Sequence, residues 1–230
     1  MNRPGESVLE SVRLDKAVYL LASNSPRRRQ LLALTGWSFS VNPADVDETP
    51  LAGEKPRDHV LRLAQSKARA LLPLAQGYSW IIAADTVVVD GENILGKPED
   101  AAQAIAVLQR LRGRTHQVYT GLALLRPSDG ALLTDVCATQ VPMRNYSDEE
   151  IRTYVASGDP LDKAGAYAIQ HAGFHPVETM RGCYANVVGL PLCHLTRLLR
   201  RLKAEPPVNI PAACQAAVVY QCPVFREILG

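Results

Sequence analysis

The chain has 230 residues, of which 47% are hydrophobic and 21% charged, and its formal net charge is +2. This length allows one large domain or two small ones, whereas a charge so near zero excludes a chain-wide basic surface for nucleic acid, and no apolar run reaches transmembrane length. Five scattered cysteines without a CxxC pair are typical of reduced thiols, so we expect a cytoplasmic protein with no membrane partner and no stable nucleic-acid partner.

The spacing of apolar residues predicts alternating strands and helices. In chain order these are a strand at 17–22, a helix at 26–35, a short strand at 39–43, a helix at 57–72, a long strand at 79–89, a short strand at 94–96, a helix at 99–111, paired strands at 116–126 and 131–142, a helix at 147–158, an irregular Gly-rich segment at 158–175 and a helix at 190–203. The alternation and the antiparallel hairpin predict an α/β domain with a mixed sheet over residues 17–203. Residues 1–16 are polar and residues 204–230 are weakly patterned, so we expect an N-terminal extension and a C-terminal appendage.

Three consecutive arginines, Arg27, Arg28 and Arg29, lie in the first turn of the helix at 26–35. The positive end of the helix dipole disfavours cations there, and no acidic neighbour in the sequence offsets them. The strand before them, the small-residue loop "ASNS" and the helix N-terminus together form the type of backbone N–H pocket that binds anions. Bound phosphate would make the cluster favourable, so we interpret it as a phosphate site; three solvated surface arginines are the alternative.

Asp85 interrupts the apolar run "IIAADTVVVD". Because burying an unpaired carboxylate costs several kcal/mol, we expect Asp85 to be paired, to bind a metal, or to lie at the open end of its strand. Catalytic groups are common at such strand ends, whereas a hydrogen-bonded structural aspartate is the alternative. The loop "ADVDETP" adds Asp45, Asp47 and Glu48, whose carboxylates are the ligand type that Mg²⁺ prefers.

Basic and amide side chains in three other segments suit the same chemistry. Lys97 lies in the constrained turn "LGKPED", which could direct its ammonium towards a phosphate, whereas Lys67 in the helix at 57–72 cannot be distinguished from a surface lysine by pattern alone. The stretch "GDPLDKAGAYAIQHAG" carries Lys163 and Gln170. A glutamine amide offers one donor and one acceptor to the edge of a base; a Gly-rich surface loop is the alternative interpretation.

Taken together, these segments resemble the Maf family of nucleoside triphosphate pyrophosphatases. The motifs occur in family order as "LASNSPRRRQLL", "DVDET", "LAQSKA", "AADTVVV", "GKPED", "YTG", "DKAGAYAIQ" and "NVVGLPL". The resemblance covers about residues 18 to 200. It implies a mixed α/β fold with a twisted central sheet, flanking helices and a cleft between two lobes, related to the inosine-triphosphatase architecture.

The resemblance also implies an activity. This is hydrolysis of a nucleoside triphosphate between its α and β phosphates, which gives a nucleoside monophosphate and pyrophosphate with the help of a divalent cation, Mg²⁺ or Mn²⁺. The segment "DKAGAYAIQ" is similar to the subfamily that acts on dTTP and UTP, so these or modified pyrimidine nucleotides are the expected substrates. A 7-methyl-GTP pyrophosphatase and a non-catalytic nucleotide- or RNA-binding module are the alternatives, and the family pattern is compatible with a homodimer.

The family pattern further implies roles for individual residues. The residues expected to bind substrate are Ser23, Arg27, Arg28, Thr86, Lys163 and Gln170. The residues expected to be catalytic are Asp85, Lys67 and Lys97, and those expected to hold the cation are Glu48 and Asp85. In this scheme Asp85 accepts the proton of the attacking water, the two lysines neutralise developing charge, and Thr86 and Gln170, with Arg27 or Arg28, set the choice of base.

Overall fold

A computed structural model describes residues 18–230, so the expected N-terminal extension at 1–16 lies outside the described residues. The strands are β1 (Val18–Leu21), β2 (Ser38–Val41), β3 (Trp80–Asp90), β4 (Asn93–Leu95), β5 (Thr115–Leu125) and β6 (Leu132–Pro142). The helices are α1 (Pro26–Ala33), α2 (Pro56–Ala70), α3 (Ala101–Leu111), α4 (Asp148–Ala156), α5 (Tyr184–Val188), α6 (Leu192–Arg200), α7 (Ile210–Val218) and α8 (Phe225–Leu229), with short 3-10 turns between them. Within residues 18–230, none of the helices has the length and apolar character needed to span a membrane.

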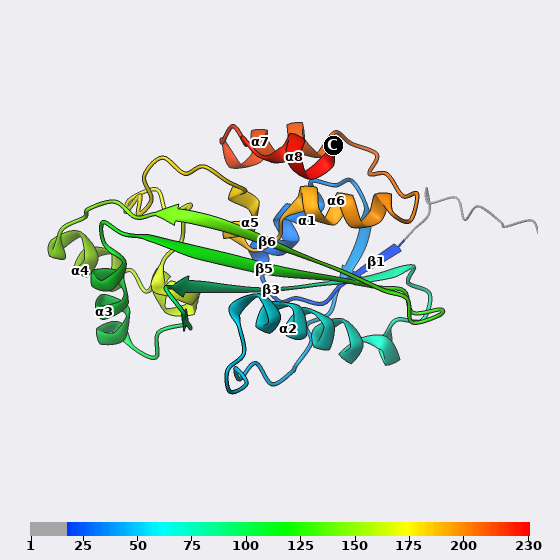
Figure 1. Cartoon of the computed structure of the whole chain (residues 1–230), viewed down its shortest axis with the longest axis horizontal. Helices are drawn as coiled ribbons and strands as arrows, with labels where there is room; N and C mark the ends of the chain where they lie inside the picture. Colours follow the sequence, from blue (N-terminus) through cyan, green and yellow to red (C-terminus); the bar gives the residue numbers. More distant parts are fainter. Residues whose placement is uncertain (1–17) are drawn as a thin grey trace, which may run out of the picture.

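The strands form one mixed six-stranded sheet in the order β2-β1-β3-β5-β6, with β4 paired to β3. Strand β1 runs parallel to both of its neighbours, β2 and β3, whereas the pairs β3–β4, β3–β5 and β5–β6 are antiparallel. The three long strands twist along the length of the molecule (Figure 1). The predicted mixed α/β fold is therefore confirmed, as are the predicted strands and helices from β1 to α4.

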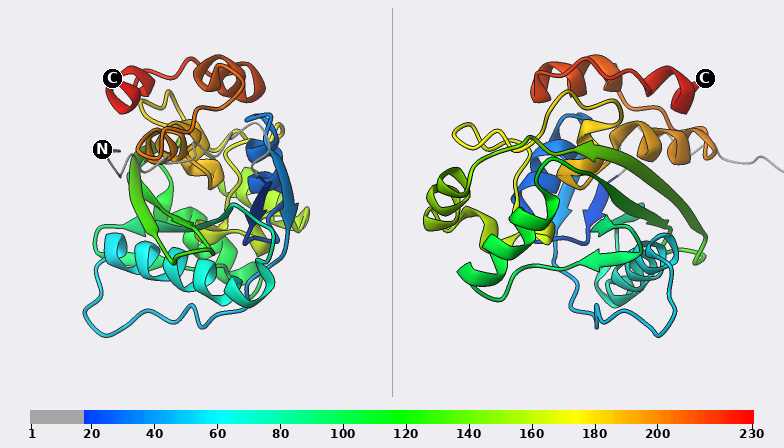
Figure 2. Two further views of the ribbon diagram at one scale, coloured as in Figure 1. Left: turned by 90° about the vertical axis from the view of Figure 1, so that its right-hand side faces the viewer. Right: turned by 60° about the vertical axis from the view of Figure 1, so that its left-hand side comes forward.

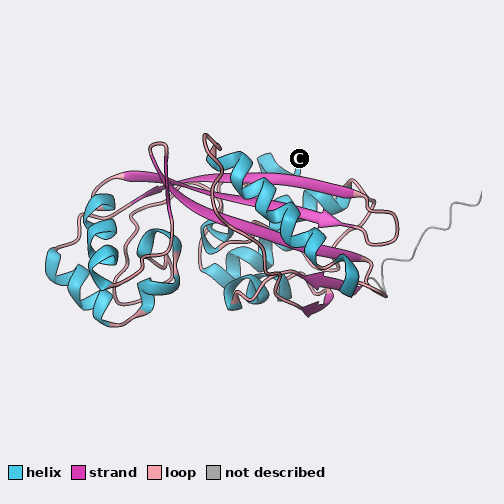
Figure 3. Ribbon diagram, turned by 90° about the horizontal axis from the view of Figure 1, so that it is seen from below, coloured by secondary structure: helices cyan, strands magenta, loops and turns pink. Residues whose placement is uncertain are grey.

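Two lobes share the long strands. At one end the sheet is covered on both faces. Leu20 and Ile81 face a core between the sheet and α2, and the adjacent Leu21 and Ile82 face a second core on the side of α6. At the other end, Val88 and its neighbours pack against α3 and α4 in a separate apolar cluster. Figure 3 shows these two groups of helices gathered around opposite ends of the strands.

The position of α2 depends on a glycine in β5. A Cβ at Gly121 would lie 2.4 Å from the backbone oxygen of Val60, so only glycine lets the helix approach the sheet this closely. The small, fully buried Ala64 and Ala68 continue the same close packing along α2. Since Gly121 pairs with Asp85 across the sheet, α2 brings its own polar residues next to that aspartate.

The C-terminal segment forms two helices that pack on the domain. Helices α7 and α8 lie against α6 on one side of the sheet (Figures 1 and 2). Ile210 is buried in the core cluster that includes Leu195 and Leu199, and Phe225 packs against the same cluster. The weak sequence pattern at 204–230 does not predict these helices, because α7 is apolar except for Gln215 and α8 has only five residues.

Candidate active site

A cleft of about 640 Å³ is lined by residues of both lobes. Its walls are the loop between β1 and α1, the middle of β3, the segment around residues 162–170 and the end of α5. All the site residues predicted from the sequence line this cleft: Ser23, Arg27, Arg28, Glu48, Lys67, Asp85, Thr86, Lys97, Lys163 and Gln170.

The N-terminus of α1 opens into the cleft. The backbone N–H of Ala22 donates to Ile82 (2.8 Å), which keeps the chain on the sheet until the loop begins. Ser25 then caps the helix by accepting from the backbone N–H of Arg28 (3.4 Å), and Pro26 occupies the first helical position. Of the three arginines, Arg29 is exposed and does not line the cleft, so two of them face it.

The guanidinium of Arg28 is held by neutral oxygens. Its Nε donates to the carbonyl of Gly189 (2.9 Å), and its two terminal nitrogens donate to Thr86 Oγ1 (3.0 Å) and Ser23 Oγ (3.4 Å). Gly189 has φ +119°, and a Cβ there would lie 3.3 Å from Arg28 Nε. The arginine is thus fixed in orientation, and no carboxylate of residues 18–230 is in direct contact with its charge.

Two threonine hydroxyls, that of the half-buried Thr86 and that of the buried Thr120, support Arg28 from behind. Thr86 and Thr120 face each other in the β3–β5 register with their hydroxyl oxygens 2.9 Å apart, and Thr120 donates to the carbonyl of Asn186 (3.1 Å). Since each hydroxyl has one hydrogen, donation runs from Arg28 to Thr86, to Thr120 and to Asn186. The Asn186 amide also donates to Thr139 Oγ1 (2.9 Å), which ties α5 to the sheet.

Two carboxylates converge on one buried lysine. Lys67 Nζ lies 2.6 Å from Asp85 Oδ1 and 2.5 Å from Glu48 Oε1, with Lys67 7% and Asp85 5% exposed. Burial raises the pKa of Glu48, but the hydrogen bond and charge of Lys67, together with the charges of Lys97 and Arg28, outweigh this effect and hold that pKa below its ordinary value. Glu48 is therefore ionised at neutral pH, and Asp85 has the partner that its burial requires.

The acidic loop contributes one carboxylate, that of Glu48, to the cleft. Asp45 and Asp47 do not line it, and Asp47 accepts a backbone N–H within its own loop (2.9 Å). Within the described residues, no cluster of three or more His, Cys, Asp or Glu side chains is arranged to hold a metal. The donor set nevertheless fits Mg²⁺ at a phosphate site, which takes one or two carboxylates and completes its shell with phosphate oxygens and water. Glu48 and Asp85 meet this requirement, since both reach the same Lys67 ammonium.

Three cations of the cleft are not in direct contact with any carboxylate of the described residues. Arg27 and Lys97 form no side-chain hydrogen bond or ion pair with any residue between 18 and 230, and Arg28 contacts only neutral groups. The two carboxylates of the opposite wall, Glu48 and Asp85, are engaged by Lys67. The cleft therefore presents uncompensated positive charge beside a carboxylate pair, an arrangement that suits a polyanion accompanied by a hard cation.

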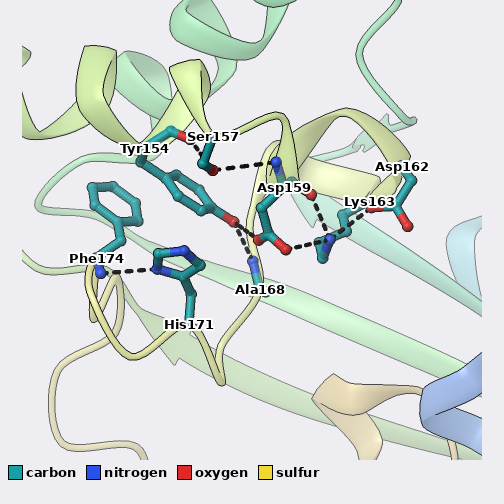
Figure 4. Close-up of polar contacts among 8 residues, drawn as sticks. All are labelled: Tyr154, Ser157, Asp159, Asp162, Lys163, Ala168, His171 and Phe174. Carbon is teal, nitrogen blue, oxygen red and sulfur yellow. Dashed lines mark hydrogen bonds and ion pairs between the residues drawn. The ribbon is translucent and has the colours of Figure 1, made fainter.

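The remaining wall carries Lys163 and Gln170. Lys163 Nζ donates to Asp159 Oδ1 (3.0 Å), to Asp162 Oδ1 (2.6 Å) and to the backbone carbonyl of Asp159 (Figure 4). These three acceptors use all three hydrogens of the ammonium, so the charge of Lys163 is neutralised within its own loop. Gln170 is exposed in the cleft, and its amide forms no side-chain hydrogen bond inside the described part of the chain.

Comparison of the sequence with known proteins identifies the family of this chain. A family model described as Maf-like protein matches residues 19–202. The chain belongs to the Maf family. Among its curated Maf relatives, a protein of Geobacter sp. (strain M21) named dTTP/UTP pyrophosphatase is 48% identical over 185 residues, which are 80% of this chain and 95% of that protein.

Another protein named dTTP/UTP pyrophosphatase, from Anaeromyxobacter dehalogenans (strain 2CP-1), is 50% identical over 194 residues, 84% of this chain and 97% of its own length. The similarity to solved structures is lower. A nucleoside-triphosphatase / dITP/XTP pyrophosphatase from Mycobacterium abscessus superposes with a TM-score of 0.40 at 17% identity, over 81% of this chain and 98% of the other. The residues beyond 202, which include α7 and α8, lie outside the Maf match.

Sequence reasoning did not single out four polar residues that support the cleft of this Maf protein. Thr120 and Asn186 hold Arg28 in place, and Tyr154 and Asp159 bind the loop that carries Gln170. Each lies inside or beside a motif that the sequence displays, but a threonine in a strand or a tyrosine in an amphipathic helix carries no local signal of a polar partner. Their partners are distant in the sequence or depend on an irregular loop.

Proposed function

We propose that this Maf protein hydrolyses dTTP and UTP to the nucleoside monophosphate and pyrophosphate. The observation that carries the proposal is the cleft in which three cations without carboxylate partners face two carboxylates converging on Lys67. Its volume of about 640 Å³ lies within the usual range of small-molecule sites, about 300–1,000 Å³. The names of relatives that are 48% and 50% identical support the reaction and the pair of substrates.

The arginine side of the cleft is proposed to bind the triphosphate. Arg27, Arg28 and Ser23 surround the N-terminus of α1, whose backbone N–H groups and dipole favour an anion. Arg28 is oriented before substrate arrives, so binding requires little reordering of its side chain. This explains why the helix tolerates cations in its first turn: its ligand is strongly anionic.

The carboxylate side is proposed to carry the chemistry. The water oxygen bonds to the α-phosphorus as Asp85 accepts its proton, the bond from that phosphorus to the bridging oxygen breaks, and the pyrophosphate leaves with that oxygen towards Lys67 and Lys97. A divalent cation, Mg²⁺ or Mn²⁺, held by Glu48 and Asp85, would supply further neutralisation of the triphosphate charge. Lys67 holds both carboxylates in place until the cation and substrate arrive.

The loop side is proposed to select the base. Uracil and thymine present the same N3–H donor between two carbonyl acceptors, and the free amide of Gln170 can donate to one carbonyl while accepting from N3–H. Thr86 contributes by orienting Arg28, and Lys163 contributes by holding the loop. Substitution of thymine by uracil leaves this pattern intact, which accounts for two substrates in one site.

The test is product analysis with purified protein, Mg²⁺ and a panel of dTTP, UTP, 7-methyl-GTP and GTP. We expect equal amounts of monophosphate and pyrophosphate, with dTTP and UTP turned over fastest. Release of orthophosphate instead of pyrophosphate would contradict cleavage between the α and β phosphates. Tight nucleotide binding without any release would favour a binding module, and preference for 7-methyl-GTP would contradict the proposed base selection.

A further inference from the structure

The segment between Gly158 and His171 forms a wall of the cleft without belonging to the sheet or to an α-helix. Its regular structure is limited to two 3-10 turns, Asp159–Asp162 and Ala164–Ala166. No sheet pairing or α-helix fixes its path; backbone hydrogen bonds within the turns and one from Gly165 to the carbonyl of Gly96 (3.1 Å) hold its middle, and side-chain contacts add to them. Gln170 lies near the end of this segment and faces the cleft.

Tyr154 of α4 joins both ends of the segment through one hydroxyl. The hydroxyl donates to Asp159 Oδ2 (2.7 Å) and accepts from the backbone N–H of Ala168 (2.9 Å). The tyrosine is 3% exposed, and its ring stacks on Phe174 at 4.3 Å and packs edge-on against His171 at 4.7 Å (Figure 4). A side chain immobilised in the core thus holds the segment at a point two residues before Gln170.

Asp159 extends the same network to the middle of the segment. While one of its carboxylate oxygens accepts from Tyr154, the other accepts from the buried Lys163. Burial raises the pKa of Asp159, but these two hydrogen bonds and the charges of Lys163 and His171 outweigh it, so the pKa lies below its ordinary value. The carboxylate stays ionised and links the start of the segment to Lys163.

We propose that Tyr154 and Asp159 are positioning residues for base recognition, although neither lines the cleft. Tyr154 fixes Ala168, and through it the direction of the Gln170 amide; Asp159 fixes Lys163, so that the two 3-10 turns keep their places. This inference rests on the proposed function, since it assigns the network to the glutamine that reads the base. On this proposal, the preference for pyrimidine nucleotides depends on the hydrogen bonds of the Tyr154 hydroxyl, which lies behind the cleft.

The test compares Tyr154→Phe with Tyr146→Phe. Phenylalanine at position 154 keeps the ring packing and removes only the hydroxyl. The hydroxyl of Tyr146 is also buried, its ring contacts the same Phe174, and it donates to Leu108 rather than to the segment (2.9 Å), so it is a matched control. For Tyr154→Phe we expect the UTP-over-GTP ratio of kcat/KM to fall about fivefold to tenfold, the effect of one lost hydrogen bond, mainly through a higher KM for UTP.

Hydrogen exchange gives a second measurement that does not depend on turnover. The Ala168 amide should exchange faster in Tyr154→Phe than in the wild type and should be unchanged in Tyr146→Phe. Wild-type selectivity and KM in a folded Tyr154→Phe variant would overturn the positioning role, as would an equal loss in Tyr146→Phe. A wild-type protein that releases no pyrophosphate from any triphosphate would instead refute the proposed function, so the two failures are distinguishable.

Discussion

Asp85→Asn tests the proposed chemistry most directly. The substitution keeps the size of the side chain and leaves an oxygen that can accept from Lys67, but it removes the negative charge and the ability to take a proton. Arg27, Arg28 and Lys97 do not contact Asp85, so the cationic side of the cleft is retained. We therefore expect turnover to be lost while nucleotide binding largely persists.

The size of both effects follows from the contacts of Asp85. Loss of a positioned general base lowers the rate about 10²–10⁴-fold, or about 3–5 kcal/mol of barrier. Breaking a buried ion pair outright costs about 3–5 kcal/mol of folding stability. Here Glu48 remains 2.5 Å from Lys67, so the ammonium keeps an ionic partner, and the expected loss is about 1–3 kcal/mol.

The assay measures pyrophosphate release from UTP, the affinity for a non-hydrolysable UTP analogue and the urea midpoint. Asp90→Asn is the matched control, because Asp90 is a second buried aspartate of β3, is paired with Arg110 and Arg114, and does not line the cleft. It should lose stability to a similar degree and keep its kcat. Undiminished kcat in Asp85→Asn, or an equal loss of kcat in Asp90→Asn, would refute the assignment of Asp85 as the proton acceptor.

Three further variants test other parts of the molecule. Gln170→Ala should reduce the preference for pyrimidine over purine triphosphates about tenfold, the value of a lost two-point contact to a base, whereas Ala at the exposed Gln140 outside the cleft should not; an unchanged substrate profile would show that the base is read elsewhere. Gly121→Ala should lower the free energy of unfolding by about 1–3 kcal/mol in a urea titration, because its Cβ meets the backbone of α2, whereas Gly96→Ala, with no atom within 4 Å of its Cβ, should not. Deletion of 204–230 should lower stability by at least about 2 kcal/mol, the contribution of one fully buried aliphatic side chain, and an unchanged midpoint would show that α7 and α8 do not stabilise the domain.

The sequence predicts the elements whose signals are local. Helix α4 is an example: Ser147 and Glu150 form a reciprocal capping box at its start, and Gly158 just beyond its end has φ +75°. Both signals can be read within a few residues, so the predicted helix at 147–158 differs from α4 only at its ends. A long strand such as β3 is equally clear, because an almost unbroken apolar run marks it in the sequence.

Burial of polar residues is the part that the sequence leaves open. In sequence Lys67 is one of several basic residues on an amphipathic helix, and it is buried because Gly121, more than fifty positions later, lets α2 approach the sheet. Thr120 and Asn186 acquire their partners in the same way, across pairings of distant segments. The local sequence pattern predicts neither how closely a helix approaches the sheet nor the register between two strands.

The same distinction decides which cations are available to a ligand. Lys67 and Lys163 both lie in the cleft, yet carboxylates of the protein already pair with them, so before substrate binds they hold Glu48, Asp85 and the loop in place. Arg28 is equally well fixed, but by a carbonyl and two hydroxyls, so its charge remains for the substrate. A cation can thus be held either by neutral acceptors, which leave its charge available, or by carboxylates, which neutralise it. A site that must bind a triphosphate strongly needs the first kind of cation where the phosphates bind and the second kind where its own carboxylates have to be held in place.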